Sequence, residues 1–507
     1  MPRAIFLGGL LSAILVAIGF RPSGEGVFER VLPWFALTPL IISLHRNRRR
    51  GRRRWLHGLT FGWILCACAL HPLVQNDLSL AGGRDAGLRE FCIVLGRNGL
   101  LWIALALTWG TFSWAGGLLL RSRMVTVPLL GLPVLWAGLE YFRASISPIP
   151  IAWLLLGESL DPGSPESFAS STIGVLGLGA LLVLTSTAFA LLVSEARLSR
   201  QVLLPALACM VVVACYFHGL RPEDETGTKT LRAGIVQIES VHTEETLELA
   251  SRIVSSDPQL VVFPETMFLT SDAKRNALEE RLVDFARVAR SEILTGIGSR
   301  SDDESAAQAK GDPAAHGRSS RLASEIVFVT REGGIRARIG SLEDGPKREG
   351  ETPLGAAVLE TEMGRLGVGF GDVFDGPDLA RRLAIDGAQI FFALDRDGGQ
   401  SGESFAAMRA RMHAFRALEN GTSLARATLA GVSGIFDAHG RPSDRSRPGS
   451  SWANVGPITL RSDGHPLTAY TRWGWKLGVV SLGLAAGFIV AAALEPLARR
   501  APAGKTA

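Results

Sequence analysis

Residues 364–380 read GRLGVGFGDVFDGPDLA, in which an apolar run of strand length meets a turn rich in glycine and aspartate and then the start of a helix. A strand that ends in a sharp turn is a common mount for a catalytic nucleophile, because the turn exposes one side chain above the sheet. The residue at this turn is Gly371, which has no side chain. The stretch therefore predicts a layered α/β domain whose nucleophile position is empty.

The apolar residues of the 507-residue chain gather in two regions. Mean hydropathy is +0.23, and the excess lies in the first 220 residues and near the C-terminus. Eight of the eleven tryptophans occur within the first 153 residues, which is typical of aromatic side chains at membrane interfaces. We predict a membrane domain of seven helices (1–220), a soluble domain (221–470), and a last transmembrane helix with a cytoplasmic tail (471–507).

Eight apolar segments approach the roughly 20 residues that a membrane-spanning helix needs. The first could instead be a signal peptide, but we favour an uncleaved helix because no cleavage pattern of small residues follows near Phe20. The predicted spans are 4–20, 30–45, 56–75, 98–120, 125–142, 170–194, 201–219 and 473–495.

The basic residues indicate the orientation of these spans. Seven arginines crowd residues 46–54, between two apolar segments, which favours a cytoplasmic loop over a nucleic-acid surface. The soluble domain then lies outside the cytoplasmic membrane, and nucleic acid is not an expected partner. The loop 143–168 falls on the same outer side. Its apolar stretch is either a loop that happens to be apolar or an interfacial segment lining a lipid entry path.

The soluble domain alternates strand and helix patterns, which predicts a mixed α/β sandwich. It contains no cysteine, so it has no disulfide, no Cys-ligated zinc and no thiol nucleophile. Strands are predicted at 231–240, 258–264, 292–298, 325–331, 335–339, 366–370, 389–394, 421–427 and 432–437, and helices at 241–256, 272–292, 377–386 and 402–419.

The segment LVVFPETM (260–267) ends a buried strand at Glu265, a place suited to a general base, although a turn-capping glutamate is the plainer alternative. VVFPET after an opening GIVQ strand resembles the nitrilase (carbon–nitrogen hydrolase) superfamily. The apolar segments around that domain resemble one branch of it, the bacterial apolipoprotein N-acyltransferases. PLLGLPVLWAGLEYFRA (128–144) and FRALENGTSLARATLAGVSGIFDAHG (415–440) support the same resemblance.

The resemblance implies a polytopic α-helical membrane protein of about eight spans with an extracytoplasmic, nitrilase-like αββα sandwich domain. It implies the bacterial inner membrane, with the soluble domain on the periplasmic side. The family moves an acyl chain from a phospholipid to the N-terminal amine of a lipoprotein, using a Glu–Lys–Cys triad and no cofactor. A thiolate suits this chemistry because it is nucleophilic near neutral pH and leaves readily from a thioester.

Carried over by motif, the triad glutamate is Glu265, the lysine position holds Ser341 and the cysteine position holds Gly371. Glu349 matches a second glutamate of the family, and Val373 replaces the glutamate of the cysteine motif. The family's T-N-D-x-W-F run falls on residues 395–400, where only the aspartate is kept.

Three interpretations stay open. The joint loss of the lysine and the cysteine favours a degenerate homologue with a binding or regulatory role toward membrane phospholipid and a lipoprotein or lipopeptide. The alternative is an active acyltransferase or amide hydrolase that uses substitute groups such as Lys347, Ser401 or Ser404. A purely structural membrane protein is the third. His413 and His439 are isolated histidines, expected on the surface or on a helix face rather than in a triad.

Overall fold

The computed structural model divides into two compact units. The helical unit is Met1–Pro222 with Arg472–Ala507, and the sandwich unit is Glu223–Thr471. The structure describes residues 2–20, 27–48, 51–80, 87–147, 150–194, 229–238, 243–265, 268–271, 275–300, 323–340, 355–397 and 403–498.

The described part of the helical unit consists mainly of apolar helices. Three segments of the described residues, Leu88–Leu119, Pro165–Ser194 and Lys476–Glu495, are long and apolar enough to cross a membrane. The helices are α1 (Pro2–Gly19), α2 (Val27–Phe35), α3 (Thr38–Arg46), α4 (Gly51–Ala69), α5 (His71–Leu80), α6 (Leu88–Leu119), α7 (Thr126–Tyr141), α8 (Ser170–Ser194) and α17 (Ala469–Ala498).

Two of the predicted spans are broken, and the prediction of single helices there was wrong. Segment 30–45 is divided between α2 and α3, and segment 56–75 between α4 and α5. In both cases a proline, Pro39 or Pro72, is the second residue of the following helix. Proline lacks a backbone N–H and its ring clashes with the carbonyl four residues earlier, so it is tolerated in the first turn of a helix and interrupts a helix that would continue through it. The predicted span 201–219 lies outside the described residues.

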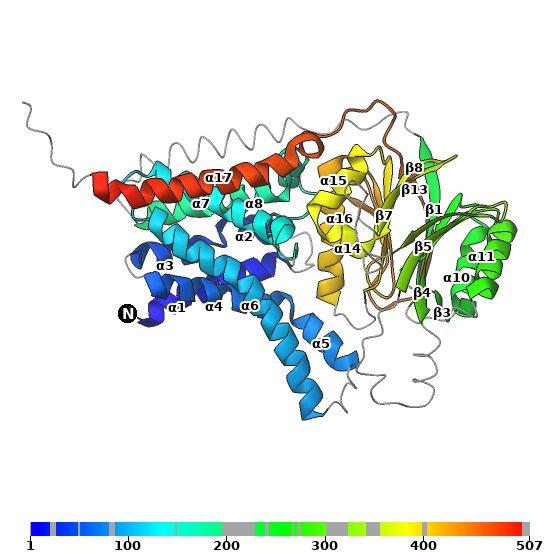
Figure 1. The fold of residues 1–507 in the computed structure, drawn as a ribbon, viewed down its shortest axis with the longest axis horizontal. Coiled ribbons are helices and arrows are strands. Elements are labelled where there is room, and N and C mark those ends of the chain that lie inside the picture. The colour runs from blue at the N-terminus through cyan, green and yellow to red at the C-terminus, as the bar shows by residue number, and fades with distance from the viewer. Residues whose placement is uncertain are drawn as a thin grey trace, which may run out of the picture. The chain divides into compact units, whose positions relative to one another are not determined.

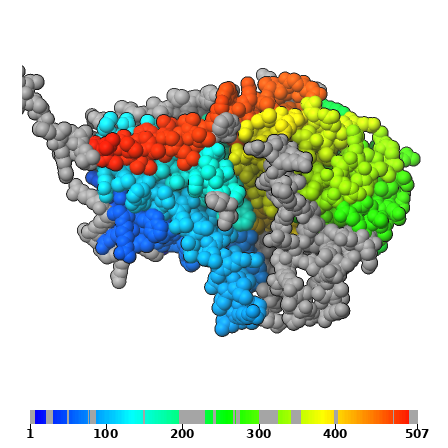
Figure 2. Space-filling model, viewed as in Figure 1, coloured from blue at the N-terminus to red at the C-terminus, as the bar shows by residue number. Residues whose placement is uncertain are grey.

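Helices α4 and α6 pack closely because glycines remove side chains at their contact. A Cβ added at Gly62 would collide with the Trp109 ring and lie 2.8 Å from the Ala106 Cα. Gly58 similarly lies against the Trp109 carbonyl. Small residues let apolar helices approach closely and gain van der Waals contact. Helix α17 lies along α7 in the same way, through Gly138 (Figures 1 and 2).

The sandwich unit contains two mixed sheets. Sheet A has the strand order β13-β1-β2-β4-β5-β6, with β3 pairing β4, and sheet B has the order β12-β11-β10-β9-β8-β7. The strands of sheet A are β1 (Thr230–Gln237), β2 (Leu260–Val262), β3 (Phe268–Ser271), β4 (Glu292–Arg300), β5 (Ala323–Val329), β6 (Ile335–Gly340) and β13 (Trp452–Thr459). Those of sheet B are β7 (Ala356–Thr361), β8 (Gly364–Phe370), β9 (Ile390–Asp395), β10 (Leu424–Thr428), β11 (Gly434–Phe436) and β12 (Pro442–Arg445).

Helices cover the outer face of each sheet, which gives four layers (Figure 1). Leu231 and Val262 of sheet A share one apolar core with Val368 and Phe391 of sheet B. A second core forms under α10 (Thr243–Val254) and α11 (Arg275–Ala289), around Phe263. Sheet B is covered by α15 (Pro377–Ile385) and α16 (Glu403–Asn420). The predicted α/β sandwich is therefore confirmed.

Most predicted elements of this unit are present, including the hairpin between β5 and β6, whose turn contains Gly333 at φ +90°. The sequence analysis missed β3, β7, β12 and β13. Strand β13 contains Pro457, which weakens a strand signal, but β13 is an edge strand of sheet A. Proline is tolerated at an edge because its missing N–H is not needed for pairing on the outer side.

We expect Gly62→Ala to destabilise the helical unit by about 1–3 kcal/mol, the usual cost of forcing a methyl group into a packed interface. The matched control is Gly99→Ala in α6, where an added Cβ meets nothing within 4 Å. The measurement is the thermal unfolding midpoint (Tm) of the detergent-solubilised chain. Equal midpoints for the two variants would contradict the glycine-mediated contact.

Candidate functional site

The predicted elbow is present. Strand β8 ends at Phe370 and runs directly into the short helix α14 (Gly371–Asp375). Strand β9 pairs parallel with β8, with Phe370 opposite Leu394, so Gly371 and Asp395 follow at the same edge of the sheet. The carboxyl ends of parallel strands are where α/β proteins gather functional groups.

The space beside Gly371 is filled by a carboxylate. A Cβ added at this position would lie 2.5 Å from Asp395 Oδ2 and closer still to Asp395 Cγ and Oδ1. Gly371 itself is buried. A side chain of any kind at position 371 therefore requires the Asp395 carboxylate to move.

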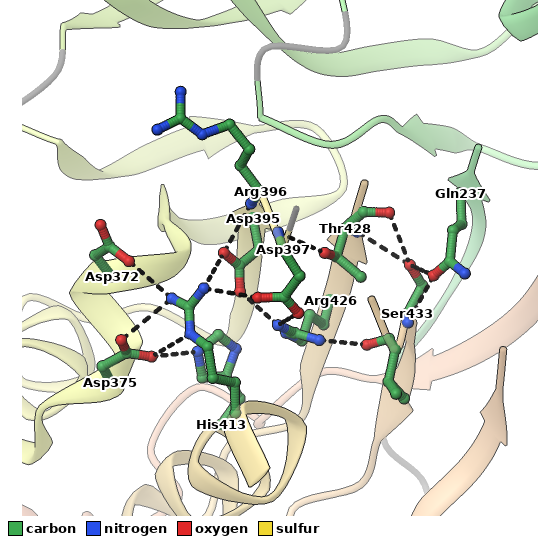
Figure 3. A network of polar contacts seen from close by, with 12 residues as sticks. Gln237, Asp372, Asp375, Asp395, Arg396, Asp397, His413, Arg426, Thr428 and Ser433 are labelled. Carbon is green, nitrogen blue, oxygen red and sulfur yellow. Dashed lines mark hydrogen bonds and ion pairs between the residues drawn. The ribbon is translucent and has the colours of Figure 1, made fainter. Parts of the chain in front are cut away.

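Arg409 of α16 holds that carboxylate in place. Its Nη1 donates to Asp395 Oδ1 at 2.7 Å and to Asp397 Oδ1 at 2.8 Å. Its Nη2 donates to Asp372 Oδ1 at 2.8 Å, and its Nε to Asp375 Oδ1 at 3.1 Å. One buried guanidinium thus contacts four carboxylates from two successive loops of sheet B (Figure 3).

Arg426 of β10 contacts the same carboxylates from the next strand. We call Arg409 and Arg426, together with Asp395 and Asp397, the clamp. Its Nη2 donates to both Asp395 Oδ2 and Asp397 Oδ2 at 2.5 Å, and its Nη1 donates to the Val432 carbonyl at 2.5 Å. The Arg426 side chain is fully buried. Asp397 in turn rests against Gly431, where an added Cβ would lie 2.8 Å from the Asp397 Cγ. The two aspartates are therefore fixed by charge on one side and by glycine on the other.

A hydrogen-bonded group next to the clamp joins the two sheets (Figure 3). Gln237, the last residue of β1, accepts through Oε1 from the Ser433 hydroxyl at 2.7 Å and from the Ser446 hydroxyl at 2.7 Å. Ser433 Oγ accepts from the Thr428 backbone N–H at 3.0 Å. The GIVQ strand of sheet A is thus bonded to the site edge of sheet B.

Burial and the neighbouring charges shift the pKa values of the ionisable groups around the clamp. Burial alone would raise the pKa of Asp395, but Arg409 and Arg426 together hold it well below its usual value. Burial lowers the pKa of His413, so this imidazole is neutral at pH 7 beside Asp375, with Nε2 3.3 Å from Asp375 Oδ1. Three buried carboxylates, those of Asp375, Asp395 and Asp397, thus face two buried guanidiniums.

Glu265 lies just beyond the end of β2, at the carboxyl edge of sheet A. Burial raises the pKa of Glu265 to about 8; the positive charge of Arg396 opposes the shift, and the negative charges of Asp395 and Asp372 add to it. The guanidinium of Arg396 points away from the clamp (Figure 3). At pH 7 Glu265 is therefore mainly protonated.

The other predicted site residues are placed as follows. Ser341 and Glu349 lie outside the described residues, as do Lys347 and Ser401. Ser404 is in the first turn of α16 and is half-buried. Of the predicted triad positions, the structure describes Glu265 and Gly371. The negative charge of Asp395 helps to raise the pKa of Glu265, and the Asp395 carboxylate lies against Gly371.

The two histidines differ from each other. His413 lies on a helix face, which was one of the two expected places. That face is buried and does not lie at the surface. His439 lies in the turn between β11 and β12, with Nδ1 3.7 Å from Asp437 Oδ2.

The clamp itself was missed in the sequence. Arg426 stands inside the buried strand LARAT, and Arg409 shares a helix face with Phe405 and Met412. Charged residues are almost never fully buried unless paired. An arginine in an otherwise apolar strand was the available signal for a buried ion-pair network.

We expect Gly371→Ala to lower the unfolding free energy by about 1–3 kcal/mol, because the methyl group overlaps a carboxylate that two arginines hold fixed. Gly340→Ala in β6 is the control, since an added Cβ there meets nothing within 4 Å. Chemical unfolding of the detergent-solubilised full chain measures both. A Gly371→Ala variant as stable as the control would show that Asp395 moves freely.

Glu265 predicts a pH dependence of stability. Its folded pKa of about 8 stands above the model-compound value of 4.5, so between these pH values the folded state binds a proton that the unfolded state releases. The unfolding free energy therefore falls as pH rises from about 5 to about 8. We expect Glu265→Gln to make this fall shallower and to raise the Tm most at the alkaline end. Parallel pH profiles for the variant and the wild type would contradict the raised pKa.

The comparisons with known proteins agree on one family. Residues 12–188 match the apolipoprotein N-acyltransferase N-terminal domain. The apolipoprotein N-acyltransferase of Gloeobacter violaceus is 25% identical over 98% of this chain and 95% of its own. That of Geobacter metallireducens is 24% identical over 87% of this chain and 86% of its own.

Solved structures also match part of the chain. An amidase from Nesterenkonia sp. is 18% identical at a TM-score of 0.35, covering 46% of this chain and 91% of that one. A carbon–nitrogen hydrolase from Helicobacter pylori is 15% identical at a TM-score of 0.35, covering 46% and 90%. By its sequence matches over nearly the whole length, the chain is similar to the apolipoprotein N-acyltransferases.

Proposed function

We propose that this protein is a degenerate apolipoprotein N-acyltransferase homologue. In this proposal it keeps the membrane architecture and binds membrane phospholipid and a lipoprotein or lipopeptide, in a binding or regulatory role. It does not transfer an acyl chain through a thioester. The named activity of the relatives, apolipoprotein N-acylation, supports the class of ligand.

The observation that carries the proposal is the Asp395 carboxylate in the space beside Gly371. A nucleophile at the elbow needs both a side chain and room for it, and here it has neither. Residues 221–470 contain no cysteine that a neighbouring position could supply. A thioester intermediate therefore has no thiol to form on in residues 221–470.

The state of Glu265 supports the same conclusion. General-base catalysis needs a carboxylate that is ionised at the working pH. With a pKa near 8, most Glu265 molecules carry the proton at pH 7. We infer that Glu265 acts as a hydrogen-bond donor in a ligand pocket and not as a base.

The membrane placement is part of the proposal. We propose an inner-membrane protein with the sandwich unit on the periplasmic side, because the arginine-rich residues 46–54 favour a cytoplasmic loop. The count of eight membrane crossings stays a prediction, in which α2 and α3 together form one crossing.

We further propose that the chain has three functional parts, 1–220, 221–470 and 471–507.

Two experiments on the purified full chain separate this proposal from its alternatives. In the first, the protein is incubated with a phospholipid carrying a heavy-isotope acyl chain, and intact mass spectrometry is used to search for an acyl adduct. The Geobacter metallireducens relative, treated in parallel, is the positive control. In the second, the protein is reconstituted in vesicles containing a photoactivatable phospholipid and a photoactivatable lipopeptide.

We expect no acyl adduct, and labelling by the phospholipid or the lipopeptide. An adduct, or rescue of a bacterial strain depleted of its acyltransferase, would overturn the loss of activity and favour substitute groups such as Lys347 or Ser404. No labelling by either probe above that of an unrelated membrane protein would favour the purely structural interpretation. Labelling within the segment 143–168 would assign a lipid path to that loop.

A further inference from the structure

Arg54, on the first turns of α4, is a buried charge without hydrogen bonds at two of its nitrogens. Its side chain is 1% exposed. Among the residues that the structure describes, its Nε and Nη1 have no hydrogen-bond partner, and both atoms are buried. A guanidinium that is removed from water without a partner is strongly unfavourable, so it marks a place where a partner is missing.

The packing around Arg54 provides room for its guanidinium. Gly117 of α6 faces it, and a Cβ added there would collide with Nη1 and lie 2.8 Å from the guanidinium carbon, Cζ. Gly58 and Gly62, one and two turns further along α4, hold α6 at the same short distance. The helix pair thus holds the guanidinium in position, and any larger residue at Gly117 would displace it.

Further positive charge surrounds this position. Arg121, in the turn that follows α6, exerts a repulsive charge on Arg54. Arg121 Nε donates to the Arg48 backbone carbonyl at 2.6 Å, which holds it beside the loop before α4. Arg52 and Arg53 are exposed on the same turn as Arg54. Two repelling cations that are held together favour an anion as the missing partner.

We propose that Arg54 and Arg121 bind a phosphate group at the ends of α4 and α6. A guanidinium forms paired hydrogen bonds with phosphate oxygens, and such charge-assisted bonds suit the two unsatisfied nitrogens of Arg54. Basic pockets between membrane helices on the cytoplasmic side recognise anionic lipid headgroups. The phosphate belongs to an anionic phospholipid or is free in solution, and the experiment distinguishes these sources. This site is independent of the acyl-transfer site and of its loss.

The test compares Arg54→Gln with Arg53→Gln, a neighbouring exposed arginine that makes the same change in net charge. The detergent-solubilised full chain is titrated with phosphatidylglycerol and, in a separate arm, with inorganic phosphate. Native mass spectrometry counts bound lipid, and the Tm is recorded with and without each ligand. We expect at least tenfold weaker phosphatidylglycerol binding for Arg54→Gln and less than a twofold change for Arg53→Gln.

The stability readout separates a ligand site from a structural role. Without ligand, we expect Arg54→Gln to be at least as stable as the wild type, since it removes an unpaired buried charge. With phosphatidylglycerol, the wild type becomes the more stable of the two. An equal, Arg54-dependent shift with inorganic phosphate would assign the site to free phosphate and support the shared chemistry.

Three results would overturn the proposal. One is an equal loss of binding in both variants, which would indicate only surface charge. Another is a lower Tm for Arg54→Gln both with and without ligand, which would indicate a structural arginine. If Arg54→Gln does not fold, Arg54→Lys is compared with Arg53→Lys. A lysine lacks the planar fork, so severalfold weaker binding is expected only at position 54, and equal binding is the third contrary result.

Discussion

The contact of Arg409 and Arg426 with Asp395 and Asp397 is the interaction on which the sandwich unit's polar centre depends. Buried ions are stable only when paired, and each of these four side chains is buried. The clamp joins α16, β10 and the end of β9, and through Asp372 and Asp375 it also joins α14. Gly371 and Gly431 provide the space that the two carboxylates occupy. A larger residue at either position would displace a carboxylate from its arginine partners.

This arrangement opposes a nucleophile by charge as well as by space. Three buried carboxylates facing two guanidiniums leave a surplus of negative charge. Burial raises the pKa of Glu265, and the negative charges of Asp395 and Asp372 add to that shift. A thiolate placed beside Asp395 would face the same repulsion, which would raise its pKa and reduce its nucleophilic fraction.

The helical unit uses glycine in a related way, with a different result. Gly117 makes room for Arg54 as Gly371 makes room for Asp395. The Asp395 carboxylate has two arginines as partners, whereas two nitrogens of Arg54 have none among the residues that the structure describes. The charges of the sandwich cluster are thus paired within the protein, and the proposal above assigns the partner of Arg54 to a ligand.

The sequence by itself determined the α/β alternation, the hairpin at Gly333 and the absence of any thiol in residues 221–470, because periodicity, turn residues and composition are local properties. Tertiary structure decided what fills the elbow. Asp395 reaches Gly371 only through the parallel register of β8 and β9, and Arg426 reaches Asp395 only through that of β9 and β10. Strand β13, with Pro457, likewise forms because β1 supplies its hydrogen bonds from more than 200 residues earlier in the chain. A local pattern reports which side of one element is buried, whereas contacts between elements depend on register and order, which no single segment encodes.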